Sequence, residues 1–167
     1  LLLATVSAMA TGAQAQQTST NQVAAKTDWS VFEDKDPREC WAVSTPKETV
    51  NTKDGRVVAV KRGEILFMTF FRPGAGVSGQ VAFTGGYPFA NGSTVNLNIG
   101  GTQFELFTEG EWAWPSSAAD DTKIIAELKR GANAVLSARS GRGTQTKDSF
   151  SLSGYTAAVD EASKRCK

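Results

Sequence analysis

Residues 64–114 form a nearly unbroken series of segments that are typical of β-strands separated by glycine. Residues 64–71 are apolar at almost every position, which indicates a strand that is buried on both faces. The later segment 94–107 alternates apolar and polar side chains on either side of Gly100 and Gly101. Because glycine reaches the positive φ of a tight turn at little cost, this segment predicts a β-hairpin. About five closely spaced strands favour an antiparallel sandwich or barrel.

Helical periodicity appears after the β-rich region and again at the end of the sequence. Ser117 and Asp120 have the spacing of a capping box, and Gly131 follows two basic residues, so a helix is expected at about 117–130. A second helix is expected at about 154–166, because apolar side chains recur there at helical spacing. The residues of this second stripe are Tyr155, Ala158, Val159, Ala162 and Cys166. Both helices are short additions to a mainly β chain.

The first residues resemble an export signal. Residues 1–15 are apolar and small and end in Ala13-Gln14-Ala15, which fits the hydrophobic region and cleavage site of a truncated signal peptide. A short buried helix is the alternative interpretation of this stretch. Residues 16–27 are polar and are expected to be a flexible N-terminus, and residues 28–167 are expected to form a single domain. We expect a periplasmic or secreted bacterial protein with no transmembrane segment once the leader is removed.

Two cysteines are present, Cys40 and Cys166. In an exported chain, two thiols most simply form one disulfide, which would join the last helix to an early strand. A pair of free thiols and a metal site are the alternatives, although two ligands without histidine are too few for zinc. Cys40 falls in a strand candidate at 39–44, whose Trp41 we interpret, together with Trp29, as a core aromatic residue.

The sequence contains no histidine. This excludes Ser-His-Asp and Cys-His catalysis, histidine-ligated metals and the commonest general base. We therefore expect a protein that is not an enzyme and that has no cofactor and no metal.

A formal net charge of +1 gives no field that would attract nucleic acid. Arg139, Arg142 and Lys147 lie around a glycine-rich turn, which we interpret as a solvated hairpin tip rather than an RNA contact.

Aromatic residues are concentrated near two turns in the β-rich region. Tyr87 and Phe89 belong to one turn, Trp112 and Trp114 to the other, and Phe107 precedes the second. Some of these side chains must belong to the core. The others are candidates for a binding platform for sugar or protein, because aromatic side chains contribute strongly to recognition.

Several segments together resemble the invasion-associated locus B family of exported bacterial proteins. They are Asp-Trp-Ser-Val at 28–31, Phe-Glu-Leu-Phe at 104–107 with the following tryptophan pair, Lys-Arg-Gly at 129–131, and Phe-Ser-Leu-Ser-Gly-Tyr-Thr-Ala-Ala at 150–158 before Cys166. The resemblance implies an immunoglobulin-like β-sandwich in the periplasm or at the cell surface. The family is named for a link to host red-cell entry and has no established catalytic residues. Many members carry a further cysteine near the position of Phe32, so a second disulfide is not available here.

The leading hypothesis is a non-catalytic envelope protein that recognises an envelope or host protein, or another envelope component. Its speculative binding residues are Tyr87, Phe89, Trp112 and Trp114. A carbohydrate-binding module is the first alternative, based on the aromatic and asparagine content of residues 87–114. A less favoured alternative is a hydrolase of envelope glycans that uses two carboxylates. Its candidate residues are Glu105, Glu109 and Glu111. The sequence does not indicate an oligomeric state.

Overall fold

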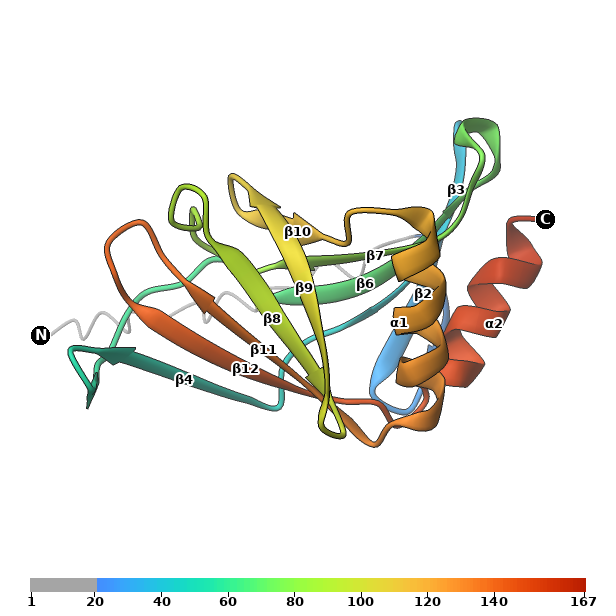
Figure 1. Ribbon diagram of the computed structural model, residues 1–167. Coiled ribbons are helices and arrows are strands. Elements are labelled where there is room, and N and C mark those ends of the chain that lie inside the picture. Colours follow the sequence, from blue (N-terminus) through green and yellow to red (C-terminus); the bar gives the residue numbers. More distant parts are fainter. Residues whose placement is uncertain (1–20) are drawn as a thin grey trace, which may run out of the picture.

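The computed structural model describes residues 21–167, so the predicted leader at 1–15 lies outside the described part of the chain. Twelve antiparallel strands form one sheet in the order β1-β2-β3-β6-β7-β10-β9-β8-β11-β12-β4-β5. The strands are β1 (Gln22–Lys26), β2 (Trp29–Lys35), β3 (Arg38–Ser44), β4 (Glu48–Lys53), β5 (Arg56–Val57), β6 (Leu66–Arg72), β7 (Val77–Thr84), β8 (Thr94–Ile99), β9 (Thr102–Glu109), β10 (Trp112–Trp114), β11 (Asn133–Arg139) and β12 (Gln145–Ser151). The other elements are a 3-10 turn, η1 (Pro73–Ala75), and two helices, α1 (Ala118–Arg130) and α2 (Tyr155–Arg165) (Figure 1). The prediction of a mainly β, antiparallel chain with two short helices is confirmed.

The sheet bends back on itself, so that its two halves face each other as layers. β6 and β12 are six positions apart in the strand order, which corresponds to about 29 Å in a flat sheet. Yet the rings of Phe67 on β6 and Phe150 on β12 have centroids 5.5 Å apart. Trp29 on β2 also donates from Nε1 to the Ser151 carbonyl of β12 at 2.9 Å. One layer therefore contains β1, β2, β3, β6 and β7, the other contains β8, β11, β12, β4 and β5, and β10 and β9 connect the two.

The core fills the space between the layers. It is built from the inward side chains of both layers and from the buried face of α2. Its largest fully buried side chains are Trp29, Tyr155, Phe67, Phe83, Phe150, Leu97, Leu106, Ile124, Leu128 and Leu136. β6, which the sequence predicts to be apolar on both faces, is indeed half-buried or buried at every position. β3, β8, β11 and β12 alternate, because only one of their faces meets the other layer, whereas the last four residues of β7 are all buried.

The hairpin predicted around Gly100 and Gly101 is present as β8 and β9. Their φ angles are 58° and 96°, which belong to the left-handed region that glycine enters readily. The two strands pair in register, with Val95 opposite Leu106 on the inner side. The Asn98 side chain stabilises the turn by accepting a hydrogen bond from the Gly101 amide at 3.0 Å.

Helix α1 begins where the capping pattern predicts and covers an edge of β7. The Ser117 hydroxyl accepts a hydrogen bond from the Asp120 amide at 3.2 Å. β10 pairs with only the last two residues of β7, so the Val81 amide has no partner on that strand. Asp121 accepts this amide at 2.8 Å through Oδ1, and burial raises the pKa of its carboxyl group. The helix thus supplies the hydrogen bond that a neighbouring strand would otherwise provide.

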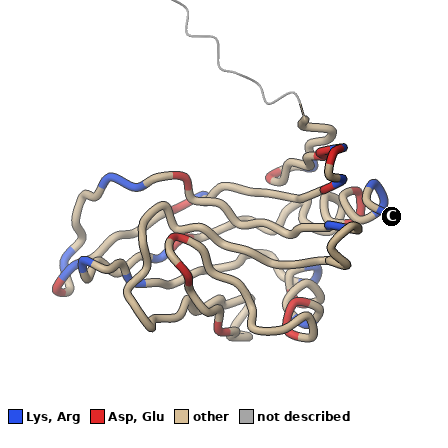
Figure 2. Tube along the Cα trace, turned by 90° about the horizontal axis from the view of Figure 1, so that it is seen from above, with Lys and Arg blue, Asp and Glu red and all other residues tan. Residues whose placement is uncertain are grey.

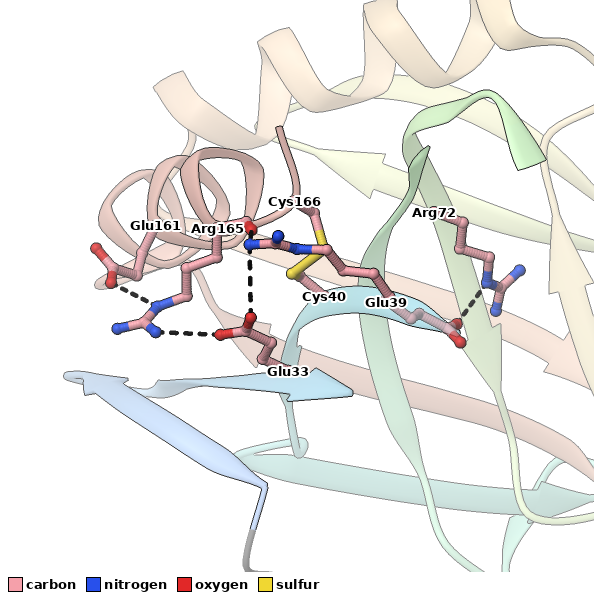
Figure 3. The surroundings of a disulfide bond; sticks show 8 residues. Glu33, Glu39, Cys40, Arg72, Glu161, Arg165 and Cys166 are labelled. Atoms are coloured by element: carbon pink, nitrogen blue, oxygen red, sulfur yellow. Dashed lines mark hydrogen bonds and ion pairs between the residues drawn. A yellow bond between two sulfur atoms is a disulfide. The ribbon is translucent and has the colours of Figure 1, made fainter. Parts of the chain in front are cut away.

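Helix α2 packs on β1, β2, β3 and β6 and is joined to β3 by the predicted disulfide. The Cα atoms of Cys40 and Cys166 are 5.9 Å apart across this bond. Figure 3 shows partly buried ion pairs beside it: Arg165 contacts Glu33 at 3.2 Å and Glu161 at 2.7 Å. The alternative predictions for the cysteines, free thiols or a metal site, are therefore excluded in this structure.

Tyr155 anchors the first turn of α2 inside the core. Its hydroxyl lies 2.9 Å from the Thr69 hydroxyl on β6, and its ring meets Trp29 edge-on at 4.9 Å. Burial raises the pKa of the Tyr155 phenol far above its ordinary value. Within residues 21–167, no helix has the length and apolar character needed to cross a membrane.

The predicted flexible N-terminus at 16–27 needs a correction. Residues Gln22–Lys26 form strand β1, which pairs with β2, and residues 16–20 lie outside the described part. The sequence did not show this strand because an outer strand has few buried side chains, and β1 has none that is fully buried. Its position depends on backbone hydrogen bonds to β2, which leave no pattern in the side chains.

Candidate functional site

The structure separates the four predicted binding residues into three environments. Phe89 is a core residue that is only 6% exposed. Tyr87 is half-buried and lines a cavity between loops. Trp112 and Trp114 point to the outside of β10, while Ala113 between them is buried. The prediction that some of these aromatic residues belong to the core and others to the surface is correct, but they do not form one site.

Trp112 and Trp114 belong to an exposed aromatic cluster with Phe107. In the pairing of β10 with β9, Trp114 lies opposite Phe107, and the two rings meet edge to face at 5.2 Å. Trp112 is 37% exposed and Phe107 is 40% exposed, which is unusual for side chains of this size. The Trp112 side chain shares this outward side because it pairs with Thr84 of β7, next to the inward-facing pair of Ala113 and Phe83.

Aromatic side chains continue on the outward side of β6, β3 and β2. Phe70 lies opposite Trp41, and Trp41 lies opposite Phe32. The rings of Phe32 and Trp41 are stacked, with an interplanar angle of 7° and centroids 5.5 Å apart. Arg72 lies over the Phe70 ring at 4.5 Å and forms an ion pair with Glu39. Charged side chains therefore lie beside Phe70 on the outward side of β6.

We call this surface the aromatic face. It is the outward side of the strands from β2 to β9, and its residues are Phe32, Trp41, Phe70, Phe107, Trp112 and Trp114. Neither helix covers it, because α2 packs on the opposite side of β2, β3 and β6, and α1 packs on β7 near Asp121. The interpretation of Trp41 as a core residue is wrong, since Trp41 is half-buried and points outward. Period-two alternation with the buried Cys40 and Ala42 was the sequence signal for this direction.

A cavity of about 570 Å³ lies near one end of the aromatic face. Its wall includes Tyr87, Pro88 and Thr146, and Lys61, Glu111 and Arg142 lie at its rim. The Tyr87 hydroxyl is 2.5 Å from the Thr146 hydroxyl, and burial raises the pKa of the Tyr87 phenol. The walls are held together through the backbone, as in the hydrogen bond from the Gly63 amide to the Gly86 carbonyl at 2.8 Å.

A buried ion pair, Arg62 with Asp148, forms the base of this cavity. The Arg62 side chain is 6% exposed and the Asp148 side chain is fully buried, and two of their N–O distances are 2.7 Å. Arg62 also donates to the Gly85 carbonyl and to Asn51. These contacts use the five donors of the guanidinium group. Arg62 is thus a structural link between the loops and β12, and it has no donor left for a ligand.

The predicted catalytic carboxylates do not form a pair. Glu105 and Glu109 are four residues apart on β9, so their Cα atoms are about 13 Å apart along the strand. Glu111 lies in the following turn, at the rim of the cavity. The buried carboxylates Asp121 and Asp148 already bind the Val81 amide and Arg62, respectively. In the described part of the chain, no three metal-ligating side chains cluster.

Comparison with a solved structure supports the fold. The crystal structure of invasion associated protein b from Bartonella henselae superposes with a TM-score of 0.56 at 15% sequence identity. The match covers 83% of this chain and 94% of the other. At this identity the similarity supports the fold and carries no residue roles.

Comparison with sequences identifies the family. No match is found among the curated proteins. The family model that describes the invasion associated locus B (IalB) protein matches residues 29–163, which is most of the chain. The chain therefore belongs to the invasion associated locus B family.

Proposed function

We propose that this protein is an exported, non-catalytic component of the bacterial envelope that binds a partner protein through its aromatic face. The observation that carries the proposal is the exposure of Trp112 and Phe107 on a sheet surface that no other described element covers. Tryptophan and other large aromatic side chains are enriched at the energetic centres of protein interfaces. The disulfide between Cys40 and Cys166 supports an oxidising location such as the periplasm or the exterior.

Protein recognition fits the ring orientation better than sugar recognition does. A sugar platform presents the flat face of a ring to its ligand. On the aromatic face, the Phe32 and Trp41 rings cover each other's faces, and the Phe107 and Trp114 rings meet edge to face. A neighbouring ring therefore covers part of each of these four rings. Such a surface suits burial against the apolar side chains of another protein, from the envelope or from a host.

The hydrolase alternative has less support. A pair of glycosidase carboxyl groups is separated by roughly 5 to 10 Å. The Cα separation of Glu105 and Glu109 along β9 is larger, and Phe107 lies between them on the same outward side. Glu111 lies in a turn at the rim of the cavity. A binding role is therefore the better interpretation of this region.

The test compares the proteins that are captured by three versions of the chain. The double substitution Phe107→Ser and Trp112→Ser removes two exposed aromatic groups without opening the core. Val57→Ser on β5 is the control, because Val57 is 79% exposed and β5 is at the end of the strand order opposite to β2. From detergent-solubilised envelope extract, we expect the double variant to lose a partner that the original chain and the control retain. An identical set of captured proteins for all three versions would refute the role of the aromatic face.

A further inference from the structure

A second surface of the sheet has a different chemical character. It is the outward side of β5, β4, β12 and β11. Two cross-strand rows define it, one with Val57, Thr52, Gln145 and Arg139, and the next with Val50, Lys147 and Ser137. A depression of about 550 Å³ lies over these rows. We call this surface the polar groove.

The cations of the polar groove form no ion pairs within residues 21–167. Neither Arg139 nor Lys147 forms an ion pair with any residue of 21–167, and both side chains are exposed. Lys53 at the end of β4, Arg56 at the start of β5 and Arg142 in the turn before β12 are likewise unpaired within the described residues. The acidic residues nearest to these cations are Asp54 in the β4–β5 turn and Glu48 on the outward side of β4, and neither forms an ion pair with a residue of 21–167. Figure 2 shows Lys and Arg gathered at this end of the molecule, away from the C-terminus.

Hydroxyl and amide groups, with the small apolar side chains of Val50 and Ala138, line the floor between these cations. Thr52, Ser137 and Gln145 line the depression, and they come from three neighbouring strands. Adjacent strands lie about 4.8 Å apart, so the groove offers a series of donors and acceptors at regular short intervals. Such a floor suits a ligand that carries many hydroxyl groups along its length.

We propose that the polar groove binds an acidic oligosaccharide, with its anionic groups on Arg139 and Lys147 and its hydroxyl groups on the floor. The anionic groups are carboxylates, sulfates or phosphates, which both side chains bind through charge-assisted hydrogen bonds. The proposal is independent of the aromatic face, which lies on other strands.

Other classes of anionic partner fit the groove less well. A bilayer surface is too flat to fill a depression. Single-stranded nucleic acid binds largely by stacking on aromatic side chains, and none of the residues that line the groove is aromatic. A peptide usually adds to a sheet edge or inserts side chains into apolar pockets, whereas this groove is an open sheet face with a polar floor.

The test is a calorimetric titration of the full chain with four probes at low salt. The probes are a heparin-derived hexasaccharide, an oligogalacturonate, neutral cellohexaose and anionic phospholipid vesicles. We expect one or both acidic saccharides to bind and the neutral saccharide and the vesicles not to bind. Binding of the oligogalacturonate would show that carboxylates suffice, whereas binding of the heparin-derived hexasaccharide alone would indicate that sulfates are needed, because heparin carries both groups. The proposal would be overturned if neither acidic saccharide binds at about millimolar concentration, or if the vesicles bind as tightly as the acidic saccharides.

Matched charge variants test the location. The double variant Arg139→Gln and Lys147→Gln removes both cations of the groove, and Lys35→Gln with Lys164→Gln removes two exposed, unpaired cations elsewhere. A charge contact at a partly exposed site contributes up to about fivefold in affinity. We therefore expect the groove variant, which loses two such contacts, to bind the acidic saccharide more weakly by up to about 25-fold, and by more than the control variant, which should bind within about twofold of the original chain. Equal weakening in both variants would indicate attraction by total charge and refute the groove.

Discussion

The two ends of the molecule are fastened in different ways. At the end that carries α2, the disulfide between Cys40 and Cys166 joins the helix to β3, and partly buried ion pairs lie beside it (Figure 3). At the cavity end, the buried pair of Arg62 and Asp148 joins the loop before β6 to β12. A covalent bond is insensitive to its polar surroundings, whereas a buried ion pair depends on complete hydrogen bonding. The difference indicates that the cavity end is the more sensitive of the two to changes in the polar groups around its link.

The charges at the two ends differ as well. Around α2, the cations Arg165 and Lys129 have acidic partners at 2.7 Å and 2.8 Å. At the cavity end, Lys61, Arg142 and Lys147 have no ion-pair partner among the described residues. Exposed ion pairs contribute little to stability. Their presence at one end and absence at the other thus bears mainly on which surface is available to a charged ligand.

The largest loss of stability is expected from removal of the disulfide. Cys40 and Cys166 are separated by 126 residues, and closure of so long a loop corresponds to about 5 kcal/mol in the chain-entropy description. We expect the Cys40→Ser, Cys166→Ser variant to lose up to this amount of free energy of unfolding, measured with guanidinium chloride. A loss below about 1 kcal/mol would mean that α2 is held by packing alone.

A somewhat smaller loss of stability is expected when the buried ion pair of Arg62 and Asp148 is broken. Arg62→Met leaves the Asp148 carboxylate buried without a cation, which costs about 3–5 kcal/mol. Adding Asp148→Leu removes the isolated charge, so the double variant should recover much of the lost stability. Urea unfolding of the two single variants and the double variant measures this coupling. If the double variant is no more stable than Arg62→Met, the pair is not the source of the sensitivity.

The smallest effects are expected at two tyrosine–threonine contacts, one at each end. Tyr155→Phe leaves the buried Thr69 hydroxyl without its partner and should cost about 1–2 kcal/mol. Tyr87→Phe should cost less than about 0.5 kcal/mol, because water in the cavity can bind Thr146 in place of the phenol. Thermal unfolding of both variants provides the comparison. Equal losses would show that the cavity end is as well shielded from water as the core.

Local sequence patterns predicted much of the fold. The hairpin at Gly100 and Gly101, the cap at Ser117 and the disulfide all depend on short-range signals or on simple counting. Strand β1 was missed because an outer strand has no buried set of side chains, and its pairing with β2 is set by the backbone.

The cavity depends on contacts between distant segments, so the sequence did not predict it. Arg62 and Asp148 are 86 residues apart, and no local pattern connects them. One signal was present: Asp148 occupies an inward position of β12, in line with Phe150. A carboxylate in a row of core residues requires a partner, although the sequence does not say which cation provides it. Likewise, the aromatic face combines side chains from five strands whose order only the sheet reveals.

The contact between Asp121 and Val81 has a consequence for self-association. A strand with free amides is a template on which other copies of a chain can add strands and grow into fibrils. By occupying the Val81 amide and placing Ile125 against Gly79, α1 makes this template inaccessible. Helix α1 therefore acts as a guard against aggregation, and substitutions that loosen it should favour fibrils even where the rest of the molecule stays intact.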